Sequence, residues 1–142
     1  MLKFRNLNVD PHAPVEEWGF EGLLAAVERG DIRDWHRLAQ AVLQDPRGKV
    51  AAELEEVLDS VEDPAMSSLF SRILRRASLR ADEDDRADVA KLMAQHLSQS
   101  RLTRTEFARQ LGTSPSRLST YLTGKVTPSA ALLIRAGKIA SR

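Results

Sequence analysis

The chain contains no cysteine, so disulfides, thiol catalysis and zinc fingers are excluded. Aromatic residues make up only 5% of the 142 residues, and no apolar run approaches the roughly 18 residues that cross a bilayer. The three histidines, His12, His36 and His96, are scattered rather than set at metal-binding spacing. A nucleophile elbow, a P-loop and a dinucleotide fingerprint are also missing. We therefore expect a cytoplasmic protein that is not an enzyme, with no catalytic residues, no metal, no cofactor and no membrane span.

Acidic residues are scarce near the C-terminus. Residues 101–142 hold eight basic side chains and a single acid, Glu106, which gives a formal charge of +7, whereas the rest of the chain carries −6. Because the whole chain has a net charge of only +1, this basic block is typical of a surface that binds a polyanion. A stripe formed by Arg72, Arg76 and Arg80 could extend that surface or pair with acidic segments, but we favour an exposed helix face.

Alternation of apolar and polar residues, as in strands, is absent, and apolar residues recur at helical spacing almost throughout. Gly30 is suited to end a first helix, and Asp31 is suited to cap a second. The sequence therefore predicts an all-α fold. The expected N-terminal helices cover residues 16–29, the stretch from Ile32 to the Asp45-Pro46 pair, residues 49–61, and a stretch that begins at Pro64.

The acidic cluster at residues 82–85 allows two interpretations of the chain around it. Acids are favoured in a first helical turn because they oppose the positive end of the helix dipole, so we interpret the cluster as the start of a new helix. The alternative is one long helix that runs from the Met66 segment straight through the cluster. In both cases an N-terminal helical region at residues 1–80 precedes a C-terminal region at residues 82–142, with the join near Ser78 to Asp85.

Residues 102–128 form the most informative stretch of the sequence. Thr103 can cap a helix, and Glu106 three residues later completes the pattern of a capping box. Gly112 can end that helix, because a left-handed backbone conformation costs glycine little. Ser114 can cap a second helix directly afterwards. Two short helices joined by a three- to four-residue turn with glycine define a helix-turn-helix, a motif that binds double-stranded DNA.

The second helix of this motif would enter the major groove with its N-terminal end nearest the bases. Leu118 and either Tyr121 or Leu122 would bury it, which leaves a polar face free. Arginine is the side chain best suited to a bidentate contact with guanine, so we predict that Arg117 is the main base reader. The predicted DNA-binding residues are Thr103, Arg104, Ser114, Pro115, Ser116, Arg117, Thr120 and Lys125.

The same stretch resembles the lambda-repressor-like, or XRE, family of helix-turn-helix proteins. The residues that carry the resemblance are Leu102, Thr103, Glu106, Ala108, Leu111, Gly112, Ser114, Ser116, Ser119, Gly124, Lys125 and Pro128. The resemblance implies that Asp85 to Gln99 form the first helix of the domain and that an apolar helix follows Pro128. The sequence departs from the family at Thr113, at Leu122 and at Pro115, where the family often has a base-reading side chain. Pro115 therefore argues against direct readout at that position.

The combined pattern predicts a sequence-specific transcriptional regulator, a repressor, that binds DNA as a homodimer, because one such domain makes too few contacts for useful specificity. Residues 18–30 resemble N-terminal regions found with this domain in bacterial regulators, some of them in toxin–antitoxin-like operons. This second resemblance implies an alternative, an antitoxin that binds its toxin through the N-terminal region and autoregulates its operon. An adaptor that no longer binds DNA is a third class, but the +7 block argues against it.

Overall fold

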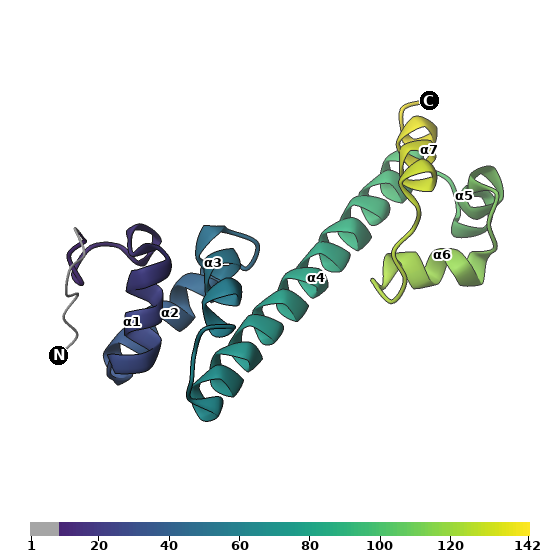
Figure 1. Cartoon of the computed structure of the whole chain (residues 1–142). Helices are drawn as coiled ribbons and strands as arrows, with labels where there is room; N and C mark the ends of the chain where they lie inside the picture. The colour runs from purple at the N-terminus through teal and green to yellow at the C-terminus, as the bar shows by residue number, and fades with distance from the viewer. Residues whose placement is uncertain (1–8) are drawn as a thin grey trace. The chain divides into compact units, whose positions relative to one another are not determined.

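The computed structural model describes residues 9–142, and this part of the chain contains helices and connecting loops but no strand, as the sequence predicts (Figure 1). Contacts between residues divide the chain into two compact units, Met1–Ala81 and Asp82–Arg142. We call them the N-terminal unit and the C-terminal unit. The first eight residues of the expected N-terminal region lie outside the described residues.

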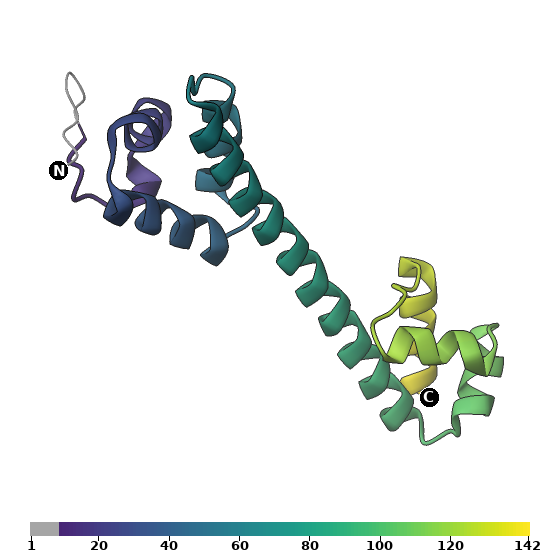
Figure 2. The ribbon, with the colours of Figure 1, turned by 90° about the horizontal axis from the view of Figure 1, so that it is seen from below.

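From residue 9 onward, the N-terminal unit contains four helical segments and the beginning of a fifth. Helix α1 packs against α3, and α2 packs against both of them (Figure 2). The fully buried side chains at the centre of this core include Leu23, Leu38, Leu54 and Phe70. The bounds of the elements are η1 (Val15–Glu17), α1 (Gly19–Arg29), α2 (Ile32–Gln44), α3 (Lys49–Leu58) and the first part of α4 (Pro64–Ser100).

The start of α2 confirms the capping role predicted for Asp31. Its carboxylate accepts hydrogen bonds from the backbone N–H groups of Arg33, at 2.9 Å, and Asp34, at 3.3 Å. The Asp34 carboxylate in turn accepts from the backbone N–H of Asp31 at 2.9 Å, which completes a capping box. The bond from the Asp34 backbone N–H, with help from that of Arg33, lowers the pKa of Asp31.

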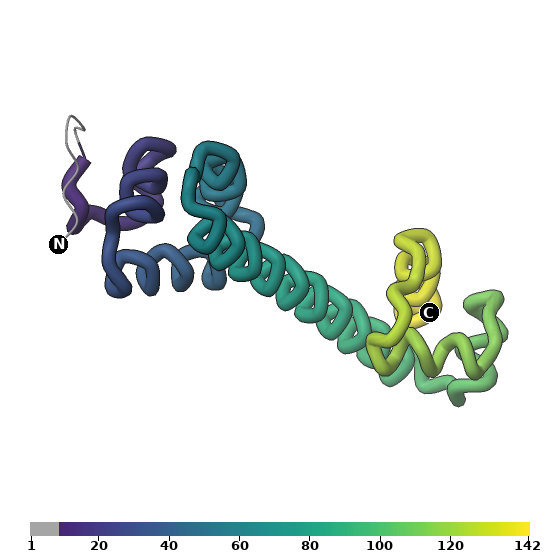
Figure 3. Tube along the Cα trace, turned by 60° about the horizontal axis from the view of Figure 1, so that its bottom comes forward, coloured from purple at the N-terminus to yellow at the C-terminus, as the bar shows by residue number. Residues whose placement is uncertain are grey.

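Helix α4 is a single element of 37 residues that continues through the acidic cluster without a break (Figure 3). The break that we favoured near residues 78–85 is therefore wrong, and the long-helix alternative is the one observed. The physical reason is that neither glycine nor proline occurs between Ala65 and Ser100, so nothing in the backbone chemistry stops the helix. Acids at residues 82–85 are compatible with a helix interior because all four side chains are exposed.

The C-terminal unit contains the end of α4 and three short helices. Phe107, Leu111, Leu118 and Met93 are fully buried at its centre, so α4, α5 and α6 share one core. None of the helices in residues 9–142 combines the length and the apolar character needed to cross a bilayer. The bounds of the three short helices are α5 (Arg104–Leu111), α6 (Pro115–Leu122) and α7 (Ala130–Ala140).

Candidate DNA-binding site

The turn between α5 and α6 is built from one glycine and two capped helix ends. Gly112 adopts φ 80°, the left-handed conformation that we predicted at this position, and it ends α5. The Arg135 side chain from α7 donates a hydrogen bond to the carbonyl of Leu111 at 2.7 Å, so one of the free carbonyls at this helix end is satisfied. Three residues, 112–114, therefore connect α5 to α6.

The N-terminus of α5 shows half of the predicted capping box. The Thr103 hydroxyl accepts a hydrogen bond from the backbone N–H of Glu106 at 3.2 Å. The Glu106 carboxylate accepts instead from the Arg109 guanidinium, at 3.1 Å from Nε, and from the Gln110 amide at 3.3 Å. The Arg109 hydrogen bonds, followed by the Gln110 bond, lower the pKa of Glu106, and the same carboxylate raises the pKa of Arg109. Glu106 thus offsets the charge of Arg109, which is exposed on the surface of α5.

Helix α6 begins as predicted. The Ser114 hydroxyl accepts a hydrogen bond from the backbone N–H of Arg117 at 3.1 Å, and Pro115 occupies the first helical position, where no N–H is needed. Leu118 and Tyr121 are both buried in the core, while Leu122 is half-buried against it. This arrangement leaves the opposite side of α6 to polar side chains.

Arg117 is exposed, but its side chain is not free, contrary to the polar and free face expected from the sequence. Its Nε donates a hydrogen bond to the Tyr121 hydroxyl at 3.2 Å, one turn further along α6. Its backbone carbonyl accepts a hydrogen bond from the Thr120 hydroxyl at 2.6 Å. The sequence indicates Tyr121 only as one of two candidates, with Leu122, for burying α6, and it predicts no contact with Arg117. The i, i+4 spacing of the two residues was the signal that they could meet.

The loop after α6 holds Lys125 in an exposed position. Gly124, which precedes it, has φ 79°, and a Cβ added there would lie 3.5 Å from the carbonyl oxygen of Arg86 in α4. The backbone N–H of Val126, which follows it, donates to the carbonyl of Thr120 at 3.2 Å. The loop therefore passes close to α4 before the lysine and is hydrogen-bonded to α6 after it.

Comparison with known families gives evidence for this motif that is independent of the geometry. Residues 70–139 match a family model described as a helix-turn-helix domain. The chain contains a helix-turn-helix domain. No curated protein and no solved structure gives a significant match to the chain. The matched range includes most of α4, all of α5 and α6 and nearly all of α7, and every predicted DNA-binding residue lies within it.

The eight predicted residues occupy three places in the helix-turn-helix domain, and none belongs to its buried core. Two lie at the start of α5, five lie from the cap of α6 to its second turn, and one lies in the following loop. Thr123, which the prediction did not include, is also exposed at the end of α6, where its hydroxyl donates to the carbonyls of Ser119 and Thr120. The spacing of Ser116, Thr120 and Thr123 places the three on one side of the helix.

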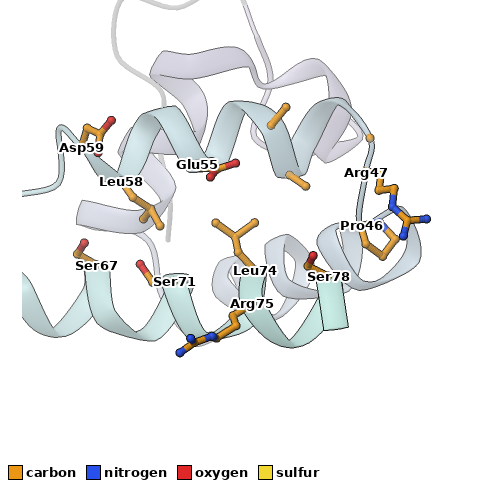
Figure 4. A pocket seen from close by; sticks show the side chains of 13 residues that line it. Pro46, Arg47, Glu55, Leu58, Asp59, Ser67, Ser71, Leu74, Arg75 and Ser78 are labelled. Carbon is orange, nitrogen blue, oxygen red and sulfur yellow. The ribbon is translucent and has the colours of Figure 1, made fainter. Parts of the chain in front are cut away.

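A second surface feature belongs to the N-terminal unit. An open groove of about 550 Å³ lies between α3 and the first part of α4, and Figure 4 shows the side chains that line it. Leu58 and Leu74 supply apolar surface, while Glu55, Asp59 and Arg75 supply charge. The described residues contain no group of three His, Asp or Glu side chains placed to hold a metal ion.

Proposed function

We propose that this protein is a sequence-specific DNA-binding transcriptional regulator, a repressor, that reads the major groove with α6. The observation that carries the proposal is the helix-turn-helix geometry itself, with α6 capped by Ser114 and polar on the side away from the core. Such a helix presents its N-terminal residues to base edges. The formal charge of +7 on residues 101–142 supplies the attraction to phosphates.

We assign the predicted residues to two tasks. Arg117 reads guanine, because its planar guanidinium matches the O6 and N7 acceptors in the major groove. Ser116 and Thr120 contact bases or phosphates beside it. Thr103, Arg104, Ser114 and Lys125 hold phosphates, which fix the register of the domain on the duplex but carry no sequence information. Pro115 has no N–H, so its contribution is limited to starting α6 in the correct conformation.

We further propose that the regulator binds as a homodimer, because two half-sites provide the specificity that one domain lacks. The two half-sites are then centred about 10 base pairs apart, one helical turn of DNA, or a multiple of that distance. Binding-site selection from a randomised duplex pool tests this directly. The expected result is one enriched sequence with two related half-sites. Failure to enrich any sequence would contradict the proposal.

An antitoxin that binds a protein partner through the N-terminal unit is the second candidate function. The groove between α3 and α4 favours it, because a mixed apolar and charged groove can receive a partner's side chains (Figure 4). The test is co-purification with the product of a neighbouring gene. Ser71→Arg, at an exposed residue that lines the groove, is expected to abolish that co-purification and to leave DNA binding intact, whereas a control at another exposed residue, Ile32→Arg on α2, is expected to change neither.

A further inference from the structure

Arg117 is held at three points by side chains of its own helix. Its backbone N–H donates to the Ser114 hydroxyl, its carbonyl accepts from the Thr120 hydroxyl, and its Nε donates to the Tyr121 hydroxyl. The first two contacts involve the backbone, and the third restrains the orientation of the guanidinium. Within the described residues, its two terminal amino groups have no hydrogen-bond partner.

Tyr121 is suited to orient the guanidinium of Arg117 because its own ring is held by the surrounding core. Tyr121 is only 5% exposed, and it packs in the same core as Phe107 and Leu118. It is also the single tyrosine of the chain. A rigid ring that brings its hydroxyl to the protein surface gives a fixed acceptor for a flexible arginine, which otherwise loses rotamer freedom when it binds.

The hydrogen bond also determines which donors of Arg117 face a ligand. A guanidinium can form a bidentate contact through its two terminal amino groups, or through Nε and one of them. With Nε bonded to Tyr121, the contact through both terminal groups remains. That pair of parallel donors matches the O6 and N7 acceptors that guanine presents in the major groove.

We propose that Tyr121 is a positioning residue for base recognition, which orients Arg117 so that its two terminal amino groups select guanine. This inference rests on the proposed function, since it needs α6 to read DNA. Tyr121 acts through Arg117 and contacts no base. Its hydroxyl therefore affects the choice of base at one position of the operator and leaves the phosphate contacts unchanged.

The experiment uses the full chain and the operator found by binding-site selection. Each base pair of one half-site is changed in turn, and the dissociation constant is measured for the wild type and for Arg117→Ala. The base pair read by Arg117 is the one whose change weakens binding by the wild type but not by Arg117→Ala. At that pair the wild type is expected to prefer guanine by about 5- to 150-fold. Tyr121→Phe keeps the buried ring and is expected to reduce this preference by about two- to tenfold. Ser141→Ala, which removes a hydroxyl from the end of α7, is the matched control.

A double mutant separates positioning from a general effect on folding. In the Arg117→Ala background, Tyr121→Phe is expected to change neither affinity nor base preference, because the group that it orients is gone. Thermal unfolding of each variant reports whether the fold is intact. If the wild type enriches no operator, the proposed function fails and this inference fails with it. If an operator is found but Tyr121→Phe keeps the full preference, or weakens binding equally on all sequences, the positioning role alone is wrong.

Discussion

Single residues with a special backbone conformation shape the turn of the helix-turn-helix domain. Gly112 has a positive φ, and a Cβ added to it would meet only the Arg135 side chain, at 3.5 Å. Gly112→Ala is therefore expected to cost about 1–2 kcal/mol from backbone strain alone. Gly137 is the matched control, because it lies within α7 and its Cβ would make an ordinary contact of 3.6 Å with His96. Gly137→Ala is expected to stabilise the protein by about 0.5–1 kcal/mol, and urea unfolding measures both changes.

Glu106 is expected to make the free energy of unfolding depend on pH in the acidic range. Its pKa is lowered first by the hydrogen bonds from Arg109, so its contribution to stability is fully present above the unfolded value of 4.5 and is lost as the pH falls through the lowered value. Glu106→Gln is expected to be less stable than the wild type at neutral pH, and the difference is expected to shrink as the pH falls below the ordinary value of 4.5. Chemical unfolding at several pH values measures it. A difference that stays constant down to about pH 2 would contradict the assignment.

Some contacts of single residues could be predicted from the sequence and others could not. The caps at Thr103 and Ser114 could be predicted because the capping hydroxyl accepts from a backbone N–H only three residues later, whatever side chain that residue carries. The partner of Glu106 could not, because Arg109 and the N-terminus of α5 compete for one carboxylate and only the side-chain conformation decides between them. The same holds for Arg117, whose bond to Tyr121 depends on a rotamer that the sequence does not specify.

At the scale of helices, the cap of α6 links stability to DNA recognition, because it defines where the proposed reading helix begins. Ser114→Ala removes the acceptor for the backbone N–H of Arg117 and is expected to cost about 1 kcal/mol in unfolding free energy. Ser116→Ala is the control, since Ser116 is exposed in the first turn and alanine favours helices. It is expected to leave stability unchanged or slightly raised. Equal losses of stability in the two variants would show that Ser114 is not the cap in solution.

The helices themselves were predictable to different degrees. The C-terminal ends of α1 and α5 were predicted correctly, because Gly30 and Gly112 follow them directly. The start of α1 was not, since the helix expected from residue 16 begins at Gly19, after the short helix η1. Helix α4 is different, because the acidic cluster at residues 82–85 suits a helix start as well as an exposed helix interior. No stop signal accompanies the cluster, and the absence of glycine and proline from residues 65–100 was the better guide.

At the scale of the whole molecule, charge is divided between the two units. The C-terminal unit has ten basic and six acidic side chains, a formal charge of +4, whereas the N-terminal unit has eleven and fourteen, a formal charge of −3. Affinity for DNA is therefore expected to fall steeply as salt concentration rises.

Lys125→Ala is expected to weaken binding to all sequences alike and to reduce the slope of log affinity against log salt by about 1 for each phosphate that the lysine neutralises. Fluorescence anisotropy over a range of salt concentrations measures the slope, and an unchanged value would mean that Lys125 does not bind phosphate.

The central claim is that α6 reads DNA sequence through Arg117, and the most direct measurement is binding-site selection with paired variants. One randomised duplex pool is used for selection with three proteins: the wild type, Arg117→Ala and Lys138→Ala. The last variant is the control, because it removes the same charge from an exposed site on α7. We predict that wild type and Lys138→Ala enrich the same operator. Arg117→Ala is predicted to lose the preference for guanine at one position in each half-site while it keeps the rest. An operator that is unchanged in Arg117→Ala would contradict the account.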